Sequence, residues 1–462
     1  MVCYNVLWRE YRRNEKVLKK KVLKQNNLLR LQKRLAVVML ALTLGLGTGC
    51  GKADDGADGT ASSEVAVSTD AQTDAGAEEE NGQESKKDND ESYAEGTYSS
   101  DAYDVAEFAA EPRKKTDEEG NRGVYYEIFV RSFADSDGDG IGDLNGVTEK
   151  LDYLQELGID GIWLMPITAS DTYHGYSVTD YVTVNPDYGT EDDLKRLLDE
   201  AHSRDMKVIM DLVINHTSIN HPWFQAAKSD ENSEYRDYYR WVYKTDKKDC
   251  NHLLDKSSWG DMVWHQEGDF YYYGVFGADM PDLNYNNPEV RQAAKDAAGH
   301  FLELGLDGFR MDAAVHIYGA HEFKQQEDSE AANITWWNEF AGYCESINPD
   351  VYLVGEVWQD DKVLENYVQP FDTKFDFAIQ QKILNCEQKG MAVPGFGDSL
   401  SVAIENIQNK YDGVDANYLN GIFGANHDQD RIASSVNSLD KARQIAAVYM
   451  TLPGNPYIYY GE

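Results

Sequence analysis

The stretch GLDGFRMDAAVH, residues 305–316, has the pattern of a short buried strand that ends in charged side chains. Alternate residues of a strand point to the same face, so Arg310 and Asp312 are predicted to lie side by side. A guanidinium at that distance favours the ionised carboxylate, and we expect a lowered pKa for Asp312, as a carboxylate nucleophile requires. An Arg-x-Asp pair alone is more often a structural ion pair. The interpretation therefore depends on what stands at other strand ends.

Short apolar runs of the same kind recur on both sides of this stretch. They are residues 125–131, 161–165, 208–213, 308–311, 352–355, 375–377, 419–424 and 457–460. Helical segments such as 144–157 and 288–304 separate most of them. Eight apolar runs that alternate with helices predict an α/β fold, a parallel (β/α)8 TIM barrel.

This pattern predicts three parts for the folded region. We expect the first part of a catalytic barrel at 114–216, a small inserted domain at 217–280, and the second part of the barrel at 281–462. The insertion is predicted because the third and fourth runs are too far apart for a simple connection. The chain stops just after the eighth run, and we expect that its C-terminal part is missing, with the barrel truncated at the eighth strand.

The N-terminal region has the pattern of a targeting signal followed by a flexible linker. A basic segment is followed by an apolar run at 35–49 of signal-peptide length, and Cys50 follows directly. We expect a signal peptide at 1–49 and a lipidated Cys50, as in bacterial lipoproteins, although an ordinary secretory signal or a simple membrane anchor would have similar features. Each alternative places the rest of the chain outside the cytoplasm, and we expect an extracellular, cell-surface lipoprotein.

Residues 50–113 are predicted to form a disordered acidic linker, because they contain almost no large apolar side chains. The chain has 81 acidic and 43 basic residues, a net charge of −38, which makes a nucleic-acid partner implausible. We expect contact with a membrane only through the lipid anchor, and a monomer. Five widely spaced cysteines predict neither a disulfide framework nor a zinc site.

Polar motifs stand at the ends of several predicted strands, where barrel enzymes place their chemistry. In order they are DLVINH (211–216), GFRMDAAVH (308–316), GEVW (355–358) and NHD (426–428). Two further motifs are HGYSVTDYVTVNPDYGT (174–190) and MPDLN (280–284). Together they resemble the signature regions of the α-amylase family of glycoside hydrolases, family thirteen, from about residue 120 to 462. The MPDLN motif resembles that of an intermediate subgroup between oligo-1,6-glucosidases and neopullulanases.

The resemblance implies a catalytic role for three carboxyl groups. Asp312 would be the nucleophile, Glu356 the general acid/base, and Asp428 the acid that stabilises the transition state. Cleavage with retention needs one ionised carboxylate and one protonated carboxylic acid, which matches this division of roles.

Further residues are implied to bind the sugar. His216 and His427 resemble the family's hydroxyl-binding histidines and Tyr176 its stacking platform, while His174 and Arg310 complete the predicted substrate site. A lone His or Tyr is more often structural, and here the motif context favours binding. Asp211 is interpreted as a supporting residue that holds Arg310.

The segment DSDGDGIGD, residues 135–143, predicts a calcium loop, because hard oxygen ligands at this spacing suit Ca²⁺. Position twelve of this loop is Gly146 rather than Glu, so it is no EF-hand. It resembles the structural calcium loop after the first strand of many members of the family. The implied ligands are Asp135, Asp137, Asp139, the carbonyl of Ile141, and Asp143. The alternative is an acidic turn that binds no ion.

The substrate predicted from these features is an α-glucan. Ser177 stands where exo-acting glucosidases usually carry an Asp, which favours an endo-acting α-amylase on starch or maltodextrins. Val315 replaces a Lys that commonly contacts sugar beyond the cleavage point, so the sequence does not predict how sugar is bound on that side. The alternatives are an α-1,6-glucosidase or neopullulanase-like hydrolase, a non-catalytic surface glucan-binding lipoprotein, and a transporter's solute-binding lipoprotein.

Overall fold

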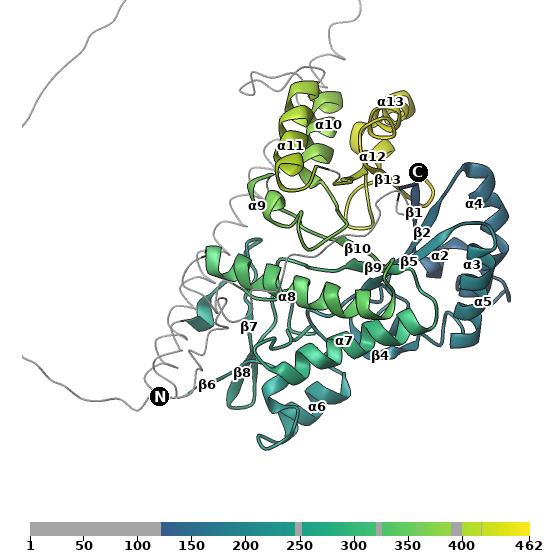
Figure 1. Cartoon of the computed structure of the whole chain (residues 1–462). Coiled ribbons are helices and arrows are strands. Elements are labelled where there is room, and N and C mark those ends of the chain that lie inside the picture. The colour runs from purple at the N-terminus through teal and green to yellow at the C-terminus, as the bar shows by residue number, and fades with distance from the viewer. Residues whose placement is uncertain (1–121, 245–251, 320–325, 360, 390–399, 417) are drawn as a thin grey trace, which may run out of the picture. The chain divides into compact units, whose positions relative to one another are not determined.

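The computed structural model describes residues 122–244, 252–319, 326–359, 361–389, 400–416 and 418–462, which belong to a unit that runs from Ser99 to Glu462 (Figure 1). The predicted signal peptide, Cys50 and the acidic linker lie outside the described residues, as do residues 114–121 of the predicted barrel.

Eight parallel strands form the central sheet. They are β1 (Tyr125–Ile128), β2 (Gly161–Leu164), β5 (Lys207–Leu212), β9 (Gly308–Met311), β10 (Tyr352–Gly355), β11 (Thr373–Lys374), β12 (Gly421–Phe423) and β13 (Asn455–Tyr459). Their order is β11-β10-β9-β5-β2-β1-β13-β12, and a parallel bridge between Phe375 and Gly421 joins the two outer strands. The sheet therefore curls into a barrel, and the predicted (β/α)8 fold is confirmed.

Two predicted runs differ from the observed elements. The first strand ends at Ile128, and the following residues form the short helix α2 (Val130–Phe133). The sixth strand is Thr373–Lys374, because Phe377 already begins helix α10 (Phe377–Lys389). The predicted helix 144–157 is divided into α3 (Leu144–Glu149) and α4 (Leu151–Leu157).

The inside of the barrel has an apolar layer beneath a charged layer. Tyr125, Trp163, Tyr352 and Tyr457 pack together, and the rings of Tyr125 and Tyr352 stack with centroids 5.1 Å apart. A Cβ atom at Gly161 would lie 2.3 Å from the Tyr125 ring, so only glycine fits there. Alternation along the strands then turns the next inward residues toward the carboxyl ends of the barrel.

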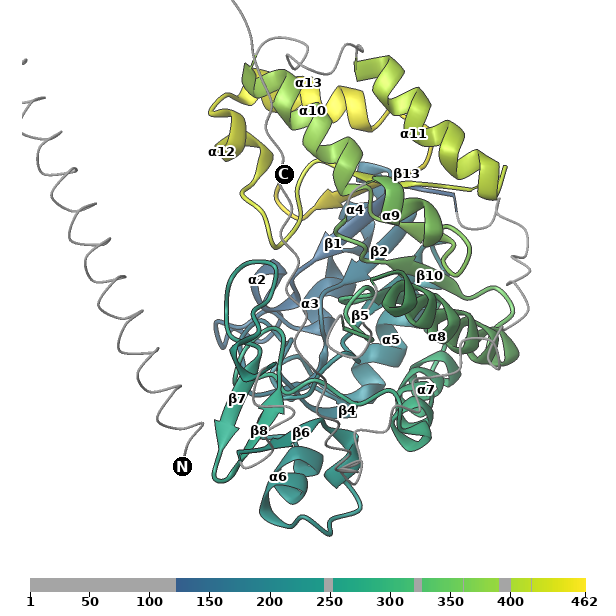
Figure 2. The same cartoon turned by 90° about the vertical axis from the view of Figure 1, so that its left-hand side faces the viewer.

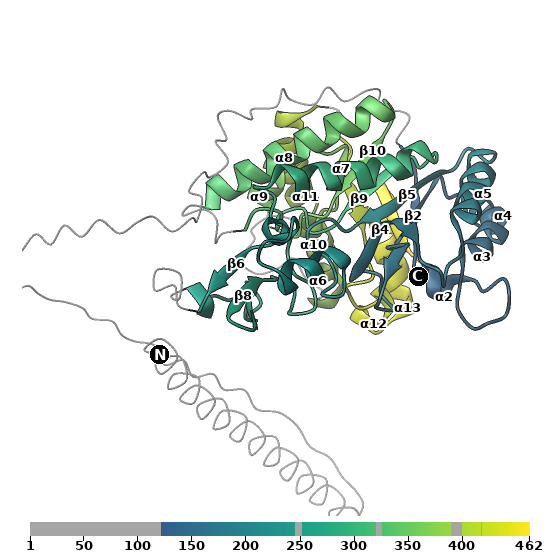
Figure 3. The same ribbon diagram turned by 90° about the horizontal axis from the view of Figure 1, so that it is seen from below.

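Helices surround the strands. They include α5 (Glu191–His202), α7 (Pro288–Glu303), α8 (Gln326–Ile347), α9 (Asp361–Asn366), α10, α11 (Leu400–Val414), α12 (Ile432–Val436) and α13 (Leu439–Tyr449). Helix α5 begins with a capping box between Thr190 and Asp193 and buries one apolar stripe against the sheet. Helices α7 and α8 lie side by side (Figures 1 and 3).

Two antiparallel sheets lie outside the barrel. One is a hairpin of β3 (Thr168–Ser170) and β4 (Val178–Val184). The other has the order β6-β8-β7, from Trp241–Tyr243, Phe270–Tyr273 and Trp264–Glu267, and lies with α6 (Pro222–Ser229) at the end opposite α10, α11 and α13 (Figure 2). Two short 3-10 helices, η2 (Arg236–Tyr238) and η3 (His252–Leu254), complete this region. Phe224, Tyr239 and Tyr272 form its aromatic core.

None of the helices in the described part of the chain combines the length and the apolar character needed to cross a bilayer.

Candidate active site

The charged layer is built by neighbouring strands. Strands β5 and β9 pair so that Asp211 stands opposite Arg310, and β10 continues directly into Glu356. Asp312 follows the last residue of β9. Because the strands are parallel, their carboxyl ends meet at one end of the barrel, where loops rather than strands begin.

Arg310 contacts three carboxylates at once. Its Nη1 donates to Asp211 Oδ1 and to Asp312 Oδ1, and its Nη2 lies 2.7 Å from Glu356 Oε1. The Arg310 side chain is fully buried. The sequence therefore predicted correctly that Arg310 and Asp312 lie side by side and that Asp211 holds Arg310.

The expected lowering of the Asp312 pKa is wrong for this free site. Burial raises the pKa of Asp312 to about 8, and the Arg310 guanidinium opposes this without overcoming it. Burial is the largest cause, and Glu356 and Asp211, which share the same guanidinium, raise the pKa further. Burial likewise raises the pKa of Asp211. One guanidinium cannot neutralise three carboxylates, so this cluster retains a proton in the free protein.

A strained residue links Asp312 to Glu356. Ala313 has a φ of 51°, a left-handed conformation that costs energy for a residue with a side chain. This conformation lets the Ala313 N–H donate to Glu356 Oε2 at 2.9 Å. With Arg310 on the other oxygen, the Glu356 carboxyl group is fixed from two sides.

The loop between β3 and β4 brings aromatic and imidazole rings over the carboxylates. Tyr176 stacks on His427, with ring centroids 5.5 Å apart and planes 15° apart, and its hydroxyl lies 2.6 Å from His427 Nε2. The Tyr176 ring also stacks on His174. His216 Nε2 lies 3.1 Å from the Tyr176 carbonyl, and burial lowers the pKa of His216 to about 4, so this ring is neutral.

A cavity of about 890 Å³ opens above this layer. The predicted residues that line it are Asp312, Glu356, Asp428, Tyr176, His174, His216 and His427. Arg310 is not among the lining residues and acts through the carboxylates that it holds. The structure thus brings seven of the eight predicted catalytic and sugar-binding side chains to one cavity wall.

Aromatic residues that the sequence did not single out complete the wall. Trp358 is half exposed and stacks on Phe377, with centroids 4.5 Å apart and planes 8° apart. Trp259 stacks on Phe276, and both rings meet His316 edge to face. Trp358 lies two residues after Glu356 and could have been found from that spacing. Trp259 could not be told apart from the aromatic core of its own region.

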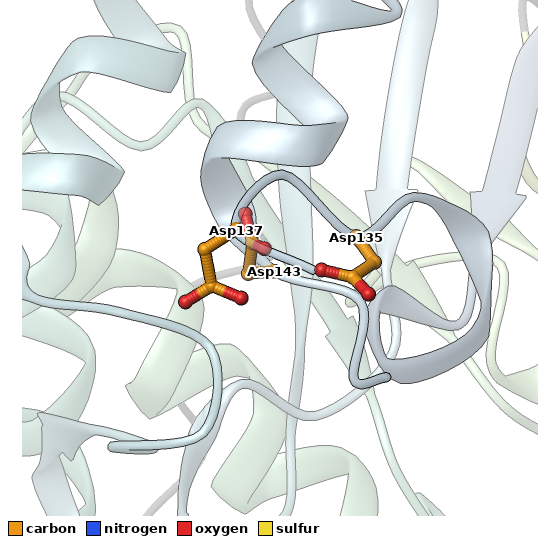
Figure 4. A group of neighbouring side chains, drawn as sticks. All are labelled: Asp135, Asp137 and Asp143. Atoms are coloured by element: carbon orange, nitrogen blue, oxygen red, sulfur yellow. The ribbon is translucent and has the colours of Figure 1, made fainter. Parts of the chain in front are cut away.

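The acidic loop after α2 brings three carboxylates together. Oxygen atoms of Asp135, Asp137 and Asp143 lie within 4.8 Å of one another (Figure 4). Backbone N–H groups of Gly140 and Gly138 lower the pKa of Asp135, which keeps it ionised. Hard carboxylate oxygens at this separation fit Ca²⁺. Asp139 is outside this described trio, and its Oδ1 accepts the N–H of Ile141 at 2.7 Å.

Residues 127–462 match the family model described as "Alpha amylase, catalytic domain". The chain belongs to the α-amylase family. The segment that matches the α-amylase family contains the four strand-end motifs and the described barrel from Glu127 onward.

Relatives of this chain in the α-amylase family are named for different activities. Alpha-amylase 3 of Dictyoglomus thermophilum is 44% identical over 73% of this chain, and the match spans 63% of the length of that protein. The 4-alpha-glucanotransferase of Thermotoga neapolitana is 36% identical, covering 73% of this chain and 71% of that protein. The crystal structure of an alpha-amylase from H. orenii aligns with a TM-score of 0.65 and 45% identity, covering 74% of this chain and 68% of that one.

Proposed function

We propose that this protein is a retaining glycoside hydrolase that cleaves α-1,4-glucosidic bonds in starch or maltodextrins. The observation that carries the proposal is the carboxylate cluster, in which Asp312 and Glu356 share Arg310 and face one cavity with Asp428. The similarity to Alpha-amylase 3 supports the bond type.

The proposed chemistry has two steps. Asp312 attacks the anomeric carbon and forms a glycosyl ester while Glu356 gives its proton to the departing oxygen. Water then attacks the ester carbon, Glu356 takes the water's proton, and Asp312 leaves as a carboxylate. Asp428 binds sugar hydroxyls as positive charge develops on the ring.

The retained proton of the cluster fits this scheme. The productive form needs Asp312 ionised and Glu356 protonated, which has the same number of protons as a form with the proton on Asp312. Asp312 and Asp211 share Arg310 with Glu356, so the proton is assigned to the cluster rather than to one oxygen.

The cavity wall suits a glucan chain. Its volume of about 890 Å³ lies in the range of ligand sites, and exposed faces of Trp358 and Trp259 offer apolar surfaces to the C–H faces of sugars. We propose endo-acting cleavage, supported by Ser177 in place of an acid that could hold a chain end. We place the protein in an intermediate subgroup on the MPDLN motif at 280–284.

Calcium and a lipid anchor are part of the same proposal. Asp135, Asp137 and Asp143, with Asp139 and the carbonyl of Ile141 contributed by the same loop, would hold a Ca²⁺ that stabilises the loop.

Cys50 would carry the lipid that keeps a monomeric enzyme on the outer cell surface. Incorporation of labelled palmitate that persists in Cys50→Ser would contradict the anchor.

The test is digestion of maltoheptaose, isomaltose and pullulan by the wild-type protein and by Asp312→Asn. We expect maltotriose and maltotetraose early from maltoheptaose, and a loss of on the order of 10⁴-fold in kcat for Asp312→Asn. Glucose alone, or preferred cleavage of isomaltose or pullulan, would favour an α-1,6-acting or neopullulanase-like enzyme. A folded protein that binds maltoheptaose and forms no product would be a glucan-binding lipoprotein.

A further inference from the structure

A buried acid that the proposed mechanism does not use lies directly behind the cavity. Glu127 is on β1, faces into the barrel, and is only 1% exposed. Its Oε1 lies 2.6 Å from Nδ1 of His427, which stands 300 residues later in the chain, beyond β12. His427 is in the cavity wall. The contact therefore connects a residue behind the cavity to a ring that faces the substrate.

The second nitrogen of His427 points to the cavity side. Nε2 lies 2.6 Å from the Tyr176 hydroxyl and 3.3 Å from Asp428 Oδ2. A neutral imidazole has one N–H, which the short contact with Glu127 occupies on Nδ1. A neutral ring can then only accept at Nε2, from the Tyr176 hydroxyl, whereas a charged ring can donate from Nε2 to the Tyr176 oxygen, to Asp428 or to a sugar hydroxyl.

We infer that Glu127 is a positioning residue that keeps His427 an imidazolium, so that its Nε2–H is a fixed hydrogen-bond donor at the sugar-binding wall. The kinetic consequence rests on the proposed function, whereas the charge state of the ring does not.

The surroundings of the ring support this charge state. Tyr176 comes from the loop after β3, Asp428 follows in the chain, Asp211 faces the ring from β5, and Arg310 faces it from β9. Burial and Arg310 oppose the charged ring, but Glu127, aided by Asp428, raises the pKa of His427 to about 9.

Burial also raises the pKa of Glu127, so the pair holds one proton between Oε1 and Nδ1. The carboxylates of Asp428 and Asp211 favour that proton on the ring. His216 is an internal contrast, because it is also almost wholly enclosed, its Nε2 faces a backbone carbonyl, and burial lowers its pKa to about 4. Burial alone would therefore leave a neutral ring in this wall.

The direct test is a pH titration of the ¹⁵N-histidine-labelled protein by NMR. The His427 signals are assigned by their loss in His427→Gln. We expect the wild-type ring to stay doubly protonated up to about pH 9, and the ring in Glu127→Gln to titrate at or below its ordinary value of 6.5. A wild-type His427 that loses its proton below pH 7 would overturn the inference, and this measurement needs neither activity nor the Glu127 variant.

The kinetic test compares kcat/KM for maltoheptaose at pH 5 and pH 8. The ratio of Glu127→Gln to wild type should fall about thirtyfold between these values, because a ring with a pKa of 6.5 is about 3% charged at pH 8. A ratio that is low but equal at both values would mean that Glu127 has only a structural role.

A matched control is available away from the cavity. His202 Nε2 lies 2.8 Å from Asp307 Oδ2, a second histidine with a carboxylate partner. Asp307→Asn makes the same chemical change as Glu127→Gln and should leave the ratio of kcat/KM values independent of pH.

Discussion

The free-site chemistry is set by one guanidinium and the three carboxylates that it contacts. Arg310 holds Asp211, Asp312 and Glu356 in one buried layer, and Ala313 adopts a positive φ that fixes Glu356 from the other side. Such a layer costs stability, because more negative charge is buried than the guanidinium compensates. The same excess negative charge retains the proton that the proposed acid step requires.

Asp312→Asn should stabilise the protein at alkaline pH. The unfolded chain releases the Asp312 proton near its ordinary pKa of 3.8, whereas the folded chain holds it to about pH 8. The stability contributed by this group is therefore fully present below pH 4 and is lost as pH rises to about 8. We expect the free energy of unfolding of Asp312→Asn, measured in urea relative to wild type, to increase between pH 5 and pH 8. The increase should exceed about 1.4 kcal/mol, the free energy of one pKa unit.

The control for this measurement is Asp440→Asn, an exposed acid on α13. Its free energy of unfolding relative to wild type should not change between the two pH values. Equal pH dependence in Asp312→Asn and wild type would show that Asp312 ionises normally in the folded protein.

Asp211→Asn should move the acidic limb of the pH profile of kcat/KM to lower pH by about one unit. Asp211 raises the pKa of Asp312 by its charge, so removing that charge makes protonation of the cluster less favourable. We also expect a loss of about tenfold in kcat, because the amide cannot accept from Arg310 and from Trp163 Nε1 with two carboxylate oxygens. A limb that stays in place or moves upward would contradict the charge argument.

Sequence patterns predicted residues at the strand ends better than residues behind them. Arg310, Asp312 and Asp211 share strand alternation within short motifs, which is a local signal. Glu127 gave no such signal, because the role of a single acid in an apolar strand cannot be predicted without its partner. The closed barrel places His427 beside it. The pKa of Asp312 was wrongly predicted because its burial, and the two acids that share Arg310 with it, come from the closed barrel and not from the local sequence.

At the scale of elements, the strands and helices with the clearest patterns were predicted well. β9 and β10 have the expected limits, because each is a run of buried residues between turns. The predicted sixth strand was displaced because Phe375 and Phe377 pack in the barrel core after β11 has ended, and α10 already begins at Phe377. The break between α3 and α4 is at Lys150, because its φ of −98° and ψ of 3° interrupt the helix.

The acidic loop should respond to calcium. At a concentration one hundred times its dissociation constant, Ca²⁺ should stabilise the folded protein by about 2.7 kcal/mol, which raises Tm by roughly 5 °C, and a chelator should reverse this. Asp137→Ala should lose the response, whereas Asp192→Ala on α5 should keep it. A wild-type Tm that does not change with Ca²⁺ would leave the loop as an acidic turn.

Trp259 lies between β5 and β9, just before β7, and contributes a half-exposed aromatic ring to the cavity wall. Trp259→Ala should raise KM for maltoheptaose about tenfold, because an aromatic contact is worth about 1.4 kcal/mol. Tyr243→Ala is a control, since Tyr243 is similarly exposed on β6 and is not among the lining residues. An equal KM change in both variants would indicate loss of the inserted region's structure instead.

At the scale of the whole molecule, closure of the barrel assembles the site. It sets Glu127 beside His427 and Asp211 beside Arg310, pairs that are 300 and 99 residues apart in the chain. Loops from different strands then supply the cavity wall, among them the segments that contain Tyr173 to Tyr176 and Ser258 with Trp259. Membership of the α-amylase family does not by itself fix the reaction, because relatives of this chain include an alpha-amylase and a 4-alpha-glucanotransferase.

The most direct test of the proposed function is the anomeric form of the first products from maltoheptaose, followed by ¹H NMR from the first minutes. Attack by Asp312 and then by water inverts the anomeric carbon twice, so the new reducing ends of maltotriose and maltotetraose should appear as α-anomers before mutarotation. β-Anomers formed first would contradict Asp312 as a covalent nucleophile and the retaining mechanism built on it.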